Sequence, residues 1–153
     1  MEVSDLEIDC DTKTNREFRE SYNIEYLPED TGDIIYLNPF FVTFFDENPF
    51  KLQERTYPID FGYKDTYYYS VNLSLNNDYT IVELPKNINM SLPNKAGQIT
   101  FSTRQIRNSL VITFKINFKE AIYSPEFYPY LKEFMSKIVD IQNNSIVLLK
   151  KNI

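Results

Sequence analysis

The chain of 153 residues contains no histidine and no tryptophan, one cysteine and three glycines. The lack of histidine excludes Ser-His and Cys-His nucleophilic catalysis and histidine-ligated zinc or iron sites. Cys10 cannot form a disulfide within the chain, and without a general base it is better suited to a partly buried structural position. Three scattered glycines also exclude a glycine-rich phosphate loop. We therefore expect no catalytic residue, no metal site and no cofactor.

Long hydrophobic runs are missing as well. No apolar stretch approaches the length of about 18 residues that a bilayer-spanning helix needs, so we expect no membrane insertion. The N-terminal sequence MEVSDLEIDCD is acidic and has neither the basic nor the apolar region of a signal peptide. The chain is therefore either cytoplasmic or a segment cut from a longer precursor.

Acidic residues are concentrated at one end of the chain. Residues 1–33 carry eleven acidic and three basic side chains, whereas the remaining 120 residues carry eleven acidic and thirteen basic ones. Without a concentrated basic face, the chain is a poor candidate for binding nucleic acid. The acidic side chains near Asp9 and Asp33 lack the spacing of a calcium loop, so we interpret them as a solvated surface.

Two stretches of strict alternation, residues 66–75 and 109–119, predict half-buried strands. In the first, Tyr67 and Tyr69 face the predicted core and Tyr68 faces solvent. Further strands are predicted at 98–104 and 79–84, and earlier in the chain near 3–9, 17–26, 33–37 and 54–60. Short strands joined by turns at this spacing indicate an antiparallel β-sandwich.

The period changes near the C-terminus. Apolar residues recur at steps of three and four from Phe127 to Ile141, which is typical of an amphipathic helix. Ser124 is a candidate N-cap, and Pro129 favours a short first turn at 125–128 before a regular helix at 129–142. A short strand should follow at 145–149. The predicted fold is mainly β, an antiparallel β-sandwich with one C-terminal amphipathic α-helix packed on it.

Two prolines, each preceded by asparagine, bracket the phenylalanine-rich sequence FFVTFFDE at residues 40–47. Its aromatic residues are too dense for strand alternation. They can form a buried cluster under a loop, or an apolar surface that docks on a neighbouring domain. The candidate docking residues are Phe40, Phe41, Phe44, Phe45 and Phe50.

Tyrosines offer a second candidate surface. An exposed tyrosine can stack on a sugar ring or an extended peptide through its apolar ring while its hydroxyl binds a polar group. Tyrosine is also a common strand residue, so a purely structural role is the competing interpretation. The candidate binding aromatics are Tyr57, Tyr63 and Tyr68.

Three sequence runs resemble one known family: NPFKLQERTYPIDFGY at residues 48–63, YTIVELP at 79–85, and SPEFYPYLKEFMSKIVDIQNNSIVLLK at 124–150. They are similar to the domain of unknown function found C-terminal to transglutaminase-like cores in large exported proteins of Bacteroidetes-type bacteria. The resemblance covers roughly residues 34–150. Residues 1–33 are then either edge strands of the same domain or the tail of a preceding one.

This resemblance implies a non-catalytic structural or interaction domain. Its expected partner is the neighbouring transglutaminase-like core of the same parent chain, in the periplasm or on the cell surface as part of a longer exported precursor. The implied mechanism is docking through residues 40–50 and the NPFKLQER run. The alternative is an independent β-sandwich module that binds a glycan or peptide through exposed tyrosines.

Overall fold

The computed structural model describes residues 2–9, 18–26 and 32–152. The chain divides into two compact units, Met1–Gly32 and Asp33–Ile153. In the first unit, β1 (Glu2–Asp9) and β2 (Arg19–Glu25) pair as an antiparallel two-stranded sheet. The register shifts between Ser4 and Glu7, where Asp5 adopts a positive φ of 52° and bulges the strand.

Both strands of this first unit were predicted, near 3–9 and 17–26. Its apolar side chains remain largely exposed, among them Val3 and Ile8, as expected for a sheet of only two strands. Cys10 lies outside the described residues.

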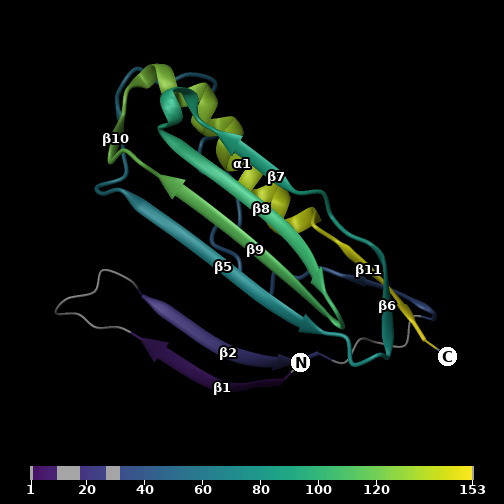
Figure 1. The fold of residues 1–153 in the computed structure, drawn as a ribbon. Helices are drawn as coiled ribbons and strands as arrows, with labels where there is room; N and C mark the ends of the chain where they lie inside the picture. Colours follow the sequence, from purple (N-terminus) through teal and green to yellow (C-terminus); the bar gives the residue numbers. More distant parts are fainter. Residues whose placement is uncertain (1, 10–17, 27–31, 153) are drawn as a thin grey trace. The chain divides into compact units, whose positions relative to one another are not determined.

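The second unit contains a four-stranded antiparallel sheet in the order β5-β9-β8-β7 (Figure 1). Its strands are β5 (Asp65–Ser74), β7 (Ile88–Ser91), β8 (Gly97–Ile106) and β9 (Ser109–Phe118). The predicted alternation sets its two faces. Leu110, Ile112, Phe114 and Ile116 of β9 are fully buried on the inner face, while the intervening residues form the outer face.

A second antiparallel sheet has the order β3-β11-β6. It consists of β3 (Ile34–Leu37), β6 (Tyr79–Glu83) and β11 (Val147–Lys151), with the C-terminal strand in the centre. Two further strands, β4 (Ile59–Asp60) and β10 (Ile122–Tyr123), pair only with each other. The predicted strand at 145–149 is therefore present, shifted by two residues.

The helix begins as predicted. A 3-10 turn at Pro125–Phe127 leads into α1 (Tyr128–Asn144), so Pro129 lies in the first helical turn, where its missing N–H removes no hydrogen bond. Ser124 has the extended backbone of a cap residue, but its side chain makes no capping hydrogen bond. The apolar stripe packs on the inner face of the four-stranded sheet, where the rings of Phe134 and Phe118 lie 5.6 Å apart.

The fold is thus mainly β, with several antiparallel sheets and one C-terminal helix, as the sequence predicted. One predicted strand was largely wrong: of residues 54–60, only 59–60 form a strand. Residues 51–58 are exposed and lack the alternating apolar side chains that would hold a strand on the core. Sequence reasoning also missed β7, which is only four residues long between Pro85 and Pro93, too short for its period to be recognised.

Residues 38–50, called the phenylalanine segment below, cover the inner face of the four-stranded sheet next to α1. Its first Asn-Pro-Phe sequence is fixed by Asn38, whose Oδ1 accepts the N–H of Phe40 at 3.0 Å. The Nδ2 of Asn38 donates to the carbonyl oxygen of Gln142 at 2.9 Å. One side chain therefore closes a tight turn and ties it to the C-terminal end of α1.

The same arrangement recurs ten residues later. Asn48 Oδ1 accepts the N–H of Phe50 at 2.8 Å. Asn48 Nδ2 donates to the carbonyl oxygen of Lys132 at 2.8 Å and to Ser136 Oγ at 2.7 Å. This second Asn-Pro-Phe turn is tied to the N-terminal half of α1, so the segment is fastened to the helix at both ends.

Between these turns, the buried side chain of Gln142 binds the segment's backbone. Gln142 Oε1 accepts the N–H of Phe44, and its Nε2 donates to the carbonyl oxygen of Phe45, both at 2.8 Å. On the sheet side, the Tyr69 hydroxyl donates to the carbonyl oxygen of Pro39 at 2.6 Å. A segment without regular structure thereby satisfies its backbone groups with side chains of α1 and β5.

Aromatic contacts complete the attachment. Phe40 packs on Tyr69 with ring centroids 5.2 Å apart and meets Phe114 edge-on at 5.4 Å. Phe44 and Phe45 both contact Tyr67, at 5.2 and 5.3 Å. These distances are typical of favourable aromatic pairs, so the phenylalanines hold the segment on the sheet.

Replacing Gln142 with leucine should loosen the phenylalanine segment. Leucine keeps most of the volume but leaves the Phe44 N–H and the Phe45 carbonyl without partners, at about 1–3 kcal/mol for each buried group. We expect the free energy of unfolding, measured by guanidinium denaturation, to fall by about 2–6 kcal/mol. Gln53→Leu, at an exposed position, is the matched control and should change stability by less than about 0.5 kcal/mol. Equal stability of the two variants would show that Gln142 does not fasten the segment.

Candidate functional site

The phenylalanine segment continues directly into an exposed loop, residues 51–58, in which all eight side chains face solvent. Buried Phe50 and Ile59 flank it and anchor both ends in the core. Leu52 is 65% and Tyr57 is 76% exposed. Large apolar side chains on a loop that is anchored at both ends are typical of a contact surface for a protein partner.

The base of this loop is fixed to α1. Tyr128 Oη donates to the carbonyl oxygen of Leu52 at 3.1 Å, and Lys132 Nζ donates to the same oxygen at 2.7 Å. The backbone of Leu52 is therefore held while its side chain is presented to solvent. Such preorganisation lowers the ordering cost of binding.

The predicted docking residues occupy two environments. Phe40 and Phe50 lie in the core, so they stabilise the domain and present little surface to a partner. Phe41, Phe44 and Phe45 are half-buried and pack against that core. The docking role predicted for this group stays a prediction, and the most accessible apolar side chains of the region are instead Leu52, Tyr57 and Val42.

Sequence reasoning missed the side chains that position this surface: Asn38, Asn48, Tyr128, Lys132 and Gln142. The repeat of Asn-Pro-Phe at a spacing of ten residues was a signal for the two asparagines. Nothing in the sequence distinguishes Gln142, because its role depends on a segment almost one hundred residues away in the chain.

The three candidate tyrosines are all exposed: Tyr57 by 76%, Tyr63 by 66% and Tyr68 by 62%. Tyr68 lies on the outer face of the four-stranded sheet, opposite Lys115 of β9. Tyr67 and Tyr69 pack against the core, as predicted. Burial, followed by a hydrogen bond with Asp65, raises the pKa of Tyr67 well above its usual value of 10.0.

The outer face around Tyr68 carries no carboxylate along β5, β8 and β9. Hydroxyl and amide groups dominate it, and its two cations are Arg104 and Lys115. Ser102 and Thr113 share a hydrogen bond of 2.7 Å across this face. The outward residues are Thr66, Tyr68, Ser70, Asn72 and Ser74 of β5; Ser109, Val111, Thr113, Lys115 and Asn117 of β9; and Gln98, Thr100, Ser102, Arg104 and Ile106 of β8.

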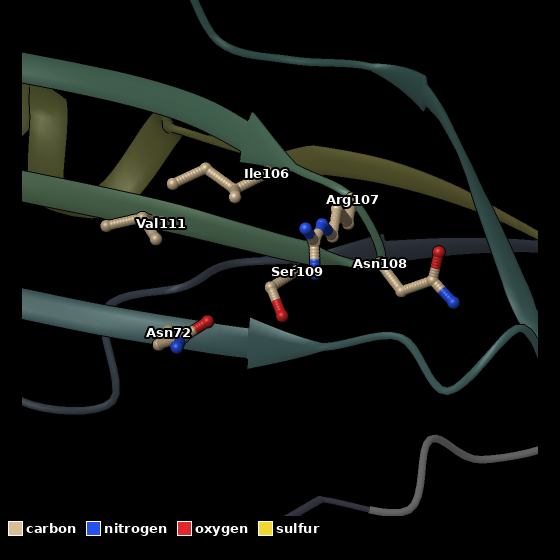
Figure 2. Close-up of a pocket in the computed structure, with 6 residues that line it drawn as sticks. All are labelled: Asn72, Ile106, Arg107, Asn108, Ser109 and Val111. Atoms are coloured by element: carbon tan, nitrogen blue, oxygen red, sulfur yellow. The ribbon is translucent and has the colours of Figure 1, made fainter.

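An open depression of about 520 Å³ lies at one end of this outer face. Figure 2 shows Asn72 on β5 near Ser109 and Val111 on β9, with Ile106, Arg107 and Asn108 where β8 turns into β9. The Asn108 amide is already hydrogen-bonded to Asn77 Oδ1. The lining offers hydrogen-bonding groups and one guanidinium, but no nucleophile paired with a base.

Shifted pKa values do not gather at this depression. Hydrogen bonds from Lys137 and Asn144 lower the pKa of Asp140, which belongs to a surface ion pair on α1. Burial raises the pKa of Tyr123, whose hydroxyl donates to the carbonyl oxygen of Ala96 at 2.9 Å. Both groups have structural partners. Among residues 2–9, 18–26 and 32–152, no three His, Cys, Asp or Glu side chains are arranged to hold a metal ion.

Within the same described ranges, no helix is both long and apolar enough to cross a membrane.

Comparison with solved structures finds a similar fold in a crystal structure from Parabacteroides distasonis ATCC 8503, described as that of a candidate protease. The TM-score is 0.51 and the sequence identity is 14%. The match covers 65% of this chain but only 19% of the other, so this chain corresponds to a small part of that protein. At this identity the similarity concerns the fold alone. No curated protein matches the chain.

A family model matches residues 33–148, which span the second unit from β3 into β11. The matched region includes the phenylalanine segment, the exposed loop, the four-stranded sheet and α1. On this match, the chain belongs to the family DUF3858, described as a domain of unknown function with a solved structure.

Proposed function

We propose that this chain is a non-catalytic structural and interaction domain, the C-terminal accessory module of an exported transglutaminase-like protein of Bacteroidetes-type bacteria. Its partner is the transglutaminase-like core of the same parent chain, in the periplasm or on the cell surface. The observation that carries the proposal is the 51–58 loop, whose backbone is fixed to α1 while Leu52 and Tyr57 are exposed.

Two further observations support an accessory role. The Parabacteroides structure of similar fold belongs to a protein about five times the length of its matched part, since the match covers 19% of it. The depression on the outer face of the sheet also lacks paired groups for acid–base or nucleophilic chemistry. A domain of this kind contributes contact surface to a larger protein.

Docking would proceed through the loop as a preformed unit. Leu52 and Tyr57 supply apolar anchors, and the surrounding polar residues Gln53, Glu54 and Arg55 form a rim. Because Phe50 and Ile59 hold the loop ends in the core, binding needs little reorganisation of the backbone. The docked loop would stabilise the transglutaminase-like core, or restrict access to the cleft of that core.

The test is calorimetric titration of the chain with the transglutaminase-like core as a separate protein. Wild type should bind saturably with a negative heat-capacity change, because apolar surface is buried. Leu52→Asp should weaken binding about tenfold or more, since it places a charge in the buried centre of the interface. Val82→Asp, which introduces the same charge at an exposed site on β6, should bind like wild type.

Two results would contradict this proposal. One is the absence of binding at high protein concentration. The other is unchanged affinity of Leu52→Asp, which would place any interface away from the loop. The melting temperature of each variant should match that of wild type, because both positions are exposed.

A second candidate function is supported by the outer face of the sheet. Exposed Tyr68 is surrounded there by hydroxyl and amide side chains, a combination suited to binding a glycan or an extended peptide. In this alternative the chain is an independent binding module, and Tyr57 and Tyr63 contribute further aromatic surface.

Screening against glycans and peptides separates the two functions. If the outer face is a binding site, Tyr68→Ala should lower affinity for a retained ligand about tenfold, because stacking is lost. Tyr36→Ala is the matched control, since Tyr36 is also highly exposed but lies on β3 in the other sheet. Equal affinity of the two variants would exclude Tyr68 as the binding residue.

A further inference from the structure

β5 is an edge strand of the four-stranded sheet, because it pairs with β9 and with no other strand in the described part of the chain. This strand runs for ten residues and pairs with β9 along its whole length without a register shift. It contains no proline and no lysine, and Asp65, at one end, is its only charged residue. A long, regular and nearly uncharged edge strand is a ready template for pairing with another strand.

Other edge strands in the described part of the chain carry protection that β5 lacks. At the opposite edge of the same sheet, β7 has four residues between Pro85 and Pro93. In the second sheet, β3 has four residues, and β6 is itself bulged where its pairing with β11 shifts register. In the first unit, β1 is bulged and carries four acidic side chains. Short length, proline, bulges and charge are the usual means of preventing edge-to-edge association.

The register identifies which backbone groups of β5 point outward. The N–H of Leu75 donates to the carbonyl oxygen of Asn108 at 2.9 Å. The backbone hydrogen bonds to β9 are therefore made by the odd-numbered residues of β5. The even-numbered residues direct their backbone groups to the open edge. Thr66 already uses its N–H to bind the Asp65 side chain, which leaves Tyr68, Ser70, Asn72 and Ser74 with both groups available in the described structure.

We propose that β5 pairs with β5 of a second copy of this chain, as an antiparallel ladder centred on Ser70. Centring on Ser70 brings the outward backbone groups of the two strands face to face, as hydrogen bonding requires. Thr66 then lies opposite Ser74 and Tyr68 opposite Asn72. The two four-stranded sheets become one continuous eight-stranded sheet with a two-fold axis, the commonest symmetry of homodimers.

The inner face of this edge is suited to a second copy. Along the inner face, Tyr67 lies opposite Leu73 and Tyr69 opposite Val71. All four of these side chains are only half-buried in the single chain, and pairing would bury more of their apolar surface.

Charge also permits self-pairing. Although each chain carries a net charge of −6, the symmetric register places no like charges opposite each other along β5. Asp65 lies opposite Leu75. Because one ladder and a few side chains form the contact, we expect a weak dimer that dissociates on dilution.

Sedimentation equilibrium of the full chain tests this interface. Wild type should approach twice the 18.2 kDa mass of the chain as its concentration is raised to about 1 mM. Ser70→Lys should raise the dissociation constant by roughly tenfold, because it sets two like charges against each other at the two-fold axis. Ile106→Lys is the matched control, exposed on the same outer face but in the interior strand β8 opposite Ser109, and should dimerise like wild type.

Mixing two variants tests the register. Ser70→Glu alone should weaken the dimer about as much as Ser70→Lys and for the same reason, and an equimolar mixture of the two should form a heterodimer at least as stable as the wild-type dimer. Circular dichroism and the melting temperature of each variant confirm that it is folded. A wild-type monomer at every concentration would overturn the proposal. So would an unchanged dissociation constant for Ser70→Lys, or two weakened variants whose mixture dimerises no better than either one alone.

Discussion

The attachment of the phenylalanine segment to α1 is the constraint that organises the second unit. The inner face of the four-stranded sheet is too wide for one helix to cover, and residues 38–50 supply the remaining cover without forming a helix or strand. Their backbone groups need partners once they are buried. Gln142 and the two asparagines at positions 38 and 48 provide hydrogen bonds between the segment and α1. These three polar side chains allow a segment without helix or strand to bury its phenylalanines.

This attachment also divides the phenylalanine-rich region into two parts with different roles. The rings of Phe40 and Phe50 are directed into the core, and their burial fixes the position at which the chain emerges. The next eight residues form a loop whose base is held by Tyr128 and Lys132 of the same helix. The same helix, α1, therefore both stabilises the phenylalanine segment and positions the exposed loop 51–58. The outer face of the sheet and the β5 edge take no part in this attachment.

The main strands and the helix could be predicted from the sequence, because the spacing of apolar residues along the chain determines which side of each element is buried. Alternation located β5, β8 and β9 to within two residues, and the change of period located α1, including the short turn before Pro129. The resemblance to a domain of unknown function agrees with the family match in its extent, residues 33–148, whereas the placement next to a transglutaminase-like core belongs to the proposal. Alternation could not locate the path of residues 38–58, because that path is set by hydrogen bonds between residues far apart in the chain. The sequence singled out the phenylalanines as a candidate surface, whereas the exposed side chains follow them, at Leu52 and Tyr57.

Hydrogen–deuterium exchange resolved to single amides would probe this attachment without any substitution. If Asn38, Gln142 and Asn48 hold the segment, the amides of Phe40, Phe44 and Phe50 should be protected nearly as well as those of β9, since each has a side-chain acceptor. The amides of residues 53–56, in the exposed loop, should exchange much faster. Uniformly rapid exchange from residue 38 to residue 58 would contradict the central claim, because it would show that α1 does not hold the segment.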